Sequence, residues 1–462
     1  MASNAPRSQS PDVLVMAAPL VVSFWMRSLF TFVDTFYAAT LGDAAVAAIG
    51  LSIPFEFLMI AVWVGLSTGL TSNIARAMGA RQGSRVEQYL SVTWRLVWAT
   101  VPVFAGVGTA CWIFAPRLAP DAETARQFAI YGAVLIGGSA FSTFWSVIPD
   151  SVVKAHGDTK ATMWAGIWSN VINVVLNTIF TFVFHWGIFG IAFSTVVGRF
   201  GGLIYALNKA AGHQKRWKQE GHANVPGLDV HPYRSLFALA VPAALGYCLM
   251  ATEGQIVNTL LAGLSNAREA IAAYGIHTRV FQFTVMPAIA TAVAMLPFAA
   301  RRFGEGDVAG IRSGLRRTHV AGLIYCAVAA PILWLGAAPL ARALSSSPIT
   351  QAYATFAVRV IPLACLAAMP IFLCRPVFEG LGRGRPGLVI AMIRYLGFTA
   401  PAAWLGIHFA SVWGVPGLYG LIVGLICAAA VASGIFVLWV RGALRKIPSS
   451  VPEPAVLAPD AG

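Results

Sequence analysis

The sequence predicts an all-α membrane protein with twelve transmembrane helices in two pseudo-symmetric six-helix bundles. Three observations predict this fold. First, apolar residues make up 58% of the 462 positions and charged residues 11%, and the mean hydropathy is +0.72, which is not typical of a soluble domain. Second, apolar stretches of about 20 residues, each able to cross about 30 Å of hydrocarbon, recur along the whole chain. Third, the two halves of the chain resemble each other.

Each apolar stretch is long enough to cross the bilayer as a helix, which rises about 1.5 Å per residue. The first carries Arg27 and Asp34 inside its apolar run, unlike the core of a signal peptide, so we expect it to stay uncleaved. We expect the spans at residues 13–40, 53–78, 90–114, 126–149, 161–184, 187–207, 235–262, 273–300, 316–337, 351–374, 386–409 and 415–440.

The basic residues predict the orientation of these spans. With both termini in the cytoplasm, 22 lysines and arginines fall on the inner segments and only four on the outer ones. This asymmetry follows the positive-inside rule. It also explains the net charge of +14 without nucleic-acid binding, so no nucleic-acid partner is expected. We expect a multi-pass monomer in a bacterial inner membrane, in contact with membrane lipid.

Three sequence matches relate the two halves. Leu41–Gly50 matches Leu264–Gly275, Ile74–Gly79 matches Ala299–Gly304, and His156–Asp158 matches Leu381–Arg383, with the paired glycines 225 residues apart each time. One shared register indicates a duplicated six-helix unit, and such bundles rock around a central cavity. We expect disordered cytoplasmic tails at 1–11 and 447–462, bundles at 12–207 and 235–446, and a cytoplasmic linker at 208–234.

Three carboxylates fall inside the expected spans: Asp34, Glu56 and Glu253. A charged carboxylate at membrane depth is costly unless it is neutralised, paired or facing water, so each is a functional candidate. Glu56 lies near the expected start of its span and could reach the outer interface. Asp34 could load and release a proton, or it could pair with Arg27 on the same helical face. Glu253 either has a coupling role or forms a salt bridge with an arginine that the sequence does not identify.

Asn173 and Asn177 lie one turn apart on the fifth span and so face the same side. Together with Asp34 and Thr195 they could bind a cation, or the asparagines could simply form hydrogen bonds between helices. Sodium prefers several oxygen ligands including an anionic one, and only Asp34 carries charge, so protonation is the simpler expectation. Apart from a coupling ion, H⁺ or Na⁺, no cofactor and no metal site is expected.

Four arginines lie deep within spans: Arg27, Arg279, Arg359 and Arg394. Together they would make a cavity positive and favour anions such as carboxylates or phosphates, so they are the candidate substrate-binding residues. The sequence contains no Walker-type phosphate loop, which argues against direct use of ATP. The loops between spans are too short for a catalytic domain. We therefore expect a transporter of a small-molecule substrate and no catalytic residues.

Several of these segments resemble the multidrug and toxic compound extrusion family, which belongs to a superfamily that also contains flippases. They are Pro19–Asp34, Asn73–Gly79, Gly157–Ala192, Phe298–Gly304 and Gly380–Arg394. The resemblance implies a secondary active exporter of small organic solutes or drugs. Such an exporter would work by alternating access and exchange its substrate for a cation.

The resemblance also implies coupling roles for Asp34 and, in the second half, for Glu253. At Asn177 the sequence departs from the family, where this position is often aspartate, and the loss of that charge favours H⁺ over Na⁺. Two alternatives stay open. Ala251–Asn258 is similar to progressive ankylosis proteins, which implies export of anionic metabolites, and the wider superfamily includes flippases of lipid-linked saccharides.

Overall fold

The computed structural model describes residues 12–219 and 227–447, apart from the side chains of residues 27–32. The expected tails, 1–11 and 447–462, lie outside the described residues except for Ile447, and so does the side chain of Arg27. All regular secondary structure in the described part of the chain is helical.

The first half crosses the membrane six times. Its helices, with η marking π-helical turns, are α1 (Val13–Leu41), α2 (Asp43–Gly79), α3 (Gly83–Leu118), a fourth crossing built from α4 (Ala122–Gly132), η1 (Ala133–Gly138), α5 (Ser139–Trp145) and α6 (Val147–Ala155), a fifth built from α7 (Thr159–Thr178) and η2 (Ile179–Val183), and α8 (Gly187–Gln219).

The second half repeats this order. Its helices are α9 (Pro232–Ala262), α10 (Ala267–Gly304), α11 (Val308–Leu344), a tenth crossing built from α12 (Pro348–Arg359) and α13 (Ile361–Gly380), an eleventh built from α14 (Arg385–Met392), η4 (Ile393–Phe398) and α15 (Thr399–Val412), and α16 (Gly417–Arg445). Eleven crossings contain a described helix long and apolar enough to span a membrane, and α1 is the twelfth. The predicted twelve-helix fold is confirmed.

Several helices extend beyond the apolar stretches that predicted them. α2 begins at Asp43, well before residue 53, because the alanine-rich turn before Pro54 is itself a good helix former. Glu56 therefore lies about 20 Å along α2 and not near the interface. At the other end of the half, α8 continues to Gln219, so the segment expected to be a linker from residue 208 begins inside a helix.

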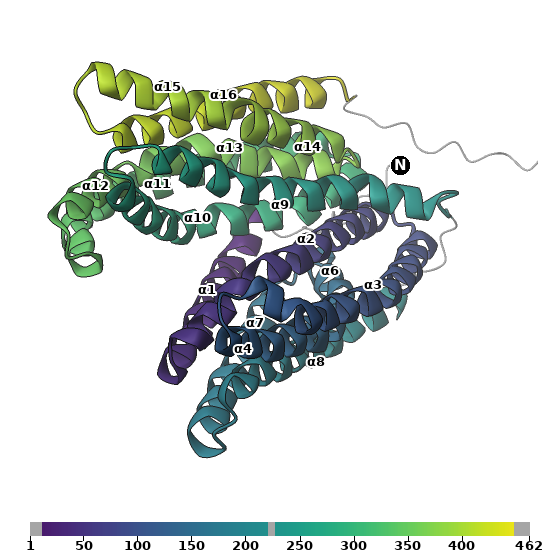
Figure 1. Cartoon of the computed structure of the whole chain (residues 1–462). Helices are drawn as coiled ribbons and strands as arrows, with labels where there is room; N and C mark the ends of the chain where they lie inside the picture. The colour runs from purple at the N-terminus through teal and green to yellow at the C-terminus, as the bar shows by residue number, and fades with distance from the viewer. Residues whose placement is uncertain (1–11, 220–226, 448–462) are drawn as a thin grey trace, which may run out of the picture.

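The backbone repeats the 225-residue register of the sequence. Gly157 and Gly382 both have φ of 79°, and Arg81 (φ 56°) is matched by Gly306 (φ 75°). Left-handed conformations of this kind are uncommon outside glycine, so two matched pairs in one register are strong evidence for duplication. Figure 1 shows the result, with α1–α8 and α9–α16 forming two separate groups of helices.

The two groups converge at the end where both described termini lie and diverge toward the opposite end (Figure 1). We call the first the basic end, because basic residues such as Arg76 and Arg301 gather there, and the second the distal end. At the basic end α2 and α10 cross at Gly79 and Gly304. A Cβ atom on Gly79 would overlap the carbonyl oxygen of Arg301, and one on Gly304 would overlap that of Arg76. The halves therefore meet backbone to backbone.

Candidate functional site

Asp34 lies in the distal part of α1, about 10 Å from the end of this helix at Leu41. The helix stops there because Gly42 turns the chain with a φ of 113°. The carboxylate is only 5% exposed. Close to it, the Tyr37 hydroxyl and the Thr178 hydroxyl lie 2.6 Å apart and link α1 to α7. This part of α1 is therefore packed inside the first half.

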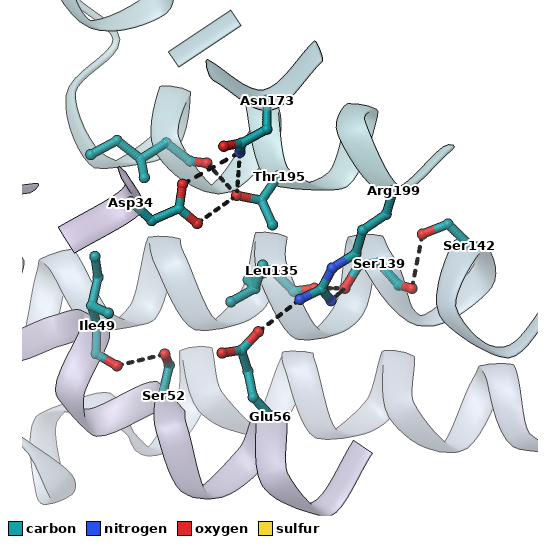
Figure 2. A network of polar contacts seen from close by, with 11 residues as sticks. Asp34, Ile49, Ser52, Glu56, Leu135, Ser139, Ser142, Asn173, Thr195 and Arg199 are labelled. Carbon is teal, nitrogen blue, oxygen red and sulfur yellow. Dashed lines mark hydrogen bonds and ion pairs between the residues drawn. The ribbon is translucent and has the colours of Figure 1, made fainter. Parts of the chain in front are cut away.

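The four side chains predicted as one cation site do lie together. Asn177 donates to Asp34 Oδ1 at 2.9 Å and Asn173 donates to the same oxygen at 3.3 Å. Thr195 donates to Oδ2 at 2.9 Å, as Figure 2 shows. Both asparagines are fully buried. Residues from α1, α7 and α8 thus surround one carboxylate.

All of these donors to Asp34 are neutral amides or hydroxyls. Behind them, Ser194 donates to Asn177 Oδ1 at 2.6 Å and Asn173 donates to Thr195 at 3.0 Å, so the donors hold one another in place. Among the described side chains, no arginine, lysine or histidine bonds to Asp34. A buried carboxylate without an opposite charge either takes up a proton or binds a cation, which is the chemistry a coupling site needs.

A second acid at membrane depth, Glu56, is only partly buried and has a different partner. Its Oε1 lies 2.9 Å from Arg199 Nη2, and Arg199 Nη1 donates to Ser139 at 2.7 Å (Figure 2). Ser139 in turn donates to the carbonyl of Leu135 in η1. The sequence analysis expected Glu56 near the start of its span, within reach of the outer interface. That expectation is wrong, because α2 begins at Asp43 and Glu56 pairs with Arg199 within the membrane span.

The arginine that pairs with Glu253 is Arg394. Its Nη2 lies 3.4 Å from Glu253 Oε1, and its guanidinium lies 4.8 Å from the centre of the Tyr395 ring. Arg394 is only 8% exposed. The pair joins α9 to η4, so a candidate coupling acid and a candidate substrate-binding arginine lie together.

The other described candidate arginines lie apart. Arg279 is exposed on the same face of α10 as Phe283, whose ring stacks on Trp25 of α1 at 5.6 Å, so Arg279 faces the first half. Arg359 is exposed and lies 4.7 Å from the ring of Trp334 on α11. The described candidate substrate-binding arginines therefore do not form one cluster.

A cluster that the sequence did not reveal joins the halves at the basic end. Asp229 accepts hydrogen bonds from Tyr89 of α3 at 2.6 Å and from Ser235 of α9 at 2.5 Å. Its backbone exchanges two further hydrogen bonds of 2.9 Å with the Gln88 side chain. Partial burial would raise the pKa of Asp229, but the hydrogen bonds from Ser235 and Tyr89 outweigh it and lower that pKa. The ionised carboxylate thus fastens the start of α9 to α3.

Two duplicated six-helix halves that meet at one end, with an acid buried inside one of them, define a membrane transporter. A family model described as MatE matches residues 19–179 and then matches again at 242–405, once in each half. The chain belongs to this family, that of the MATE transporters.

Known relatives are similar over nearly the whole chain. The FAD transporter of Shewanella oneidensis is 22% identical over 443 residues, which cover 90% of this chain and 92% of that one. The probable multidrug resistance protein NorM of Thermotoga maritima is 23% identical over 446 residues, covering 91% and 90%. A solved structure of a MOP superfamily transporter from Pyrococcus furiosus has a TM-score of 0.83 at 19% identity and covers 95% of this chain and 97% of that one. The chain is therefore a MATE-type exporter.

Proposed function

We propose that this protein exports a small organic solute in exchange for H⁺ and that Asp34 is the coupling group. The observation that carries this proposal is the contrast among three membrane-depth acids. Glu56 and Glu253 each have an arginine partner, whereas the bonds to Asp34 from described side chains all come from neutral groups. Of the three acids, Asp34 alone has no cationic partner among the described side chains, so it is the group we expect to change its charge as water reaches it from one side or the other.

The orientation of the amides supports H⁺ over Na⁺. Asn173 and Asn177 both direct their amide nitrogens, not their oxygens, at Asp34. A sodium ion would need oxygen ligands and is usually held by more than one charged or carbonyl oxygen. The same four residues remain the candidate ligands if Na⁺ is the coupling ion.

The proposed cycle places the basic end in the cytoplasm, following the positive-inside rule. The described arrangement, joined at the basic end, then corresponds to the outward-facing state (Figure 1). Protonation of Asp34 from outside removes the negative charge that strengthens its hydrogen bonds to α7 and α8. The halves then separate at the basic end, and Asp34 releases its proton to the cytoplasm as the next substrate binds.

A second candidate, export of an anionic solute, is favoured by Arg279. This arginine is exposed on the face of α10 that is directed at the first half, so it can meet a substrate between the halves. A guanidinium at that depth favours a carboxylate or phosphate over an organic cation. The Shewanella oneidensis relative is named an FAD transporter, and FAD is an anion.

Flux in proteoliposomes tests the proposal. The purified protein is reconstituted, and the movement of a cationic dye, of citrate and of an organic phosphate is measured under an imposed pH gradient and, separately, under a Na⁺ gradient. We expect uphill movement of an organic solute with the pH gradient alone. Movement that follows only the Na⁺ gradient would contradict H⁺ coupling, and movement of the dye without the anions would contradict the anionic candidate.

A further inference from the structure

The second half does not repeat the Asp34 site. The structural equivalents of α1 and α7 in this half are α9 and the crossing formed by α14, η4 and α15. In the 225-residue register, Asn173 and Asn177 correspond to Phe398 and Ala402, which offer no side-chain oxygen or nitrogen. A second cation site of the same composition is therefore missing at that level.

Instead, Glu253 and Arg394 lie about one helical turn from the positions equivalent to Asp34 and Asn173, in the direction of the basic end. Glu253 follows Pro242 by 11 residues, whereas Asp34 follows Pro19 by 15. Arg394 corresponds to position 169 in the first half, four residues before Asn173. Four residues are about 6 Å of helix, and both members are displaced in the same direction, so they still face each other across the same pair of helices. Their separation of 3.4 Å agrees with this.

We propose that Arg394 is a permanent cationic partner of Glu253 and thereby prevents Glu253 from acting as a second coupling site. This inference rests on the proposed function, in which Asp34 is the group that takes up H⁺. A guanidinium stays protonated throughout the physiological range, so the pair keeps its charges at every stage of the cycle. Each cycle then moves one H⁺, by way of Asp34, and none by way of Glu253.

Neighbouring residues keep the Arg394 guanidinium beside Glu253. The Arg394 carbonyl accepts a hydrogen bond from Thr399 at 3.0 Å, within a stretch of π-helix, and the Tyr395 ring supports the guanidinium. Besides Arg394, the phenols of Tyr274 and Tyr395 interact with the charge of Glu253. Phenols ordinarily titrate near pH 10, so neither provides Glu253 with a proton at neutral pH. Because Arg394 is only slightly exposed, it cannot also serve as an open substrate-binding site.

The test is the number of H⁺ exchanged per substrate, found in proteoliposomes from the pH gradient that balances a known substrate gradient. The double variant E253Q/R394M removes both charges and should keep the wild-type ratio of one. R394M alone leaves Glu253 without its cation, so the ratio should rise by one, and R394K should restore the wild-type value. A ratio that falls in the double variant, or an unchanged ratio in R394M, would overturn the proposal.

The double variant also covers the case in which R394M does not assemble, because replacing both partners of a buried pair is far better tolerated than removing one. E253Q alone is a further test: if Glu253 carries no H⁺, this variant should keep a ratio of one H⁺ per substrate. Asp34→Asn in the same assay addresses the proposed function separately. If Asp34→Asn kept pH-driven transport, the coupling assignment itself would fail, whatever the Glu253 variants did.

Discussion

Substitution of Gly79 by alanine should weaken the contact that joins the halves at the basic end. The added Cβ would overlap the Arg301 carbonyl oxygen and lie 3.0 Å from its carbonyl carbon and 3.1 Å from the Glu305 nitrogen. These neighbours are backbone atoms, so α2 and α10 must move apart. Overpacking by a methyl group typically costs about 1–3 kcal/mol, which corresponds to a change of about 5- to 150-fold in the balance of two states. Gly304→Ala should have the same effect, because its Cβ would meet the equivalent atoms of Arg76.

Pulsed electron–electron double resonance between spin labels at the basic end can measure the balance between the joined and separated states of the two halves. Arg216 and Arg385 are exposed and lie in different halves, so they can be exchanged for labelled cysteines once the exposed Cys248 and Cys427 are replaced by serine. We expect a longer-distance population to grow in Gly79→Ala and Gly304→Ala.

Gly106→Ala is the matched control, because a Cβ there meets no heavy atom within 4 Å. Its distance distribution should equal that of the unsubstituted protein. Equal distributions in all three variants would refute the reasoning that the two glycines hold the halves together.

Three further results are expected. Arg199→Met, which leaves the partly buried Glu56 without its partner, should lower stability by less than the roughly 3–5 kcal/mol that breaking a fully buried pair costs, and Glu56→Gln in the same chain should recover much of the lost melting temperature; no recovery would contradict the pairing. Asp229→Ala should raise protease cleavage near the start of α9. Because the folded-state pKa of Asp229 is lowered, its contribution is present above about pH 4 and is lost as pH falls through the folded pKa; resistance to protease that does not change with pH would count against it. Arg279→Gln should raise the KM for an anionic substrate at least several-fold and leave a cationic dye unaffected, and an unchanged KM would exclude substrate contact at this residue.

Much of the fold could be predicted from the sequence because the bilayer imposes a simple rule on each span. Length and apolar content identified all twelve crossings, and the glycine register identified the duplication that the backbone angles repeat. Helix ends were less predictable. Hydropathy marks the part of a helix that lies in hydrocarbon, whereas α2 and α8 continue beyond it through alanine-rich or basic turns that remain helical.

The site was predictable where its members shared a helix or a family motif. Asn173 and Asn177 could be grouped by their spacing alone, Asp34 stood out as an acid within an apolar span, and the resemblance implied its coupling role. The pairing of Glu253 with Arg394 and of Glu56 with Arg199 could not be predicted, because partners more than 140 residues apart in sequence are brought together only by tertiary packing.

The central claim is that Asp34 couples transport to H⁺, and the most direct test measures H⁺ and substrate together. Proteoliposomes are made with the unsubstituted protein, with Asp34→Asn or with the control Asp43→Asn. They are loaded with substrate and a pH-sensitive dye, and the fluxes of H⁺ and substrate are followed under an inwardly directed H⁺ gradient. We expect Asp34→Asn to lose H⁺ flux and uphill substrate movement, while Asp43→Asn, at the distal start of α2, keeps both. H⁺ flux coupled to substrate in Asp34→Asn, at the rate of the unsubstituted protein, would contradict the account.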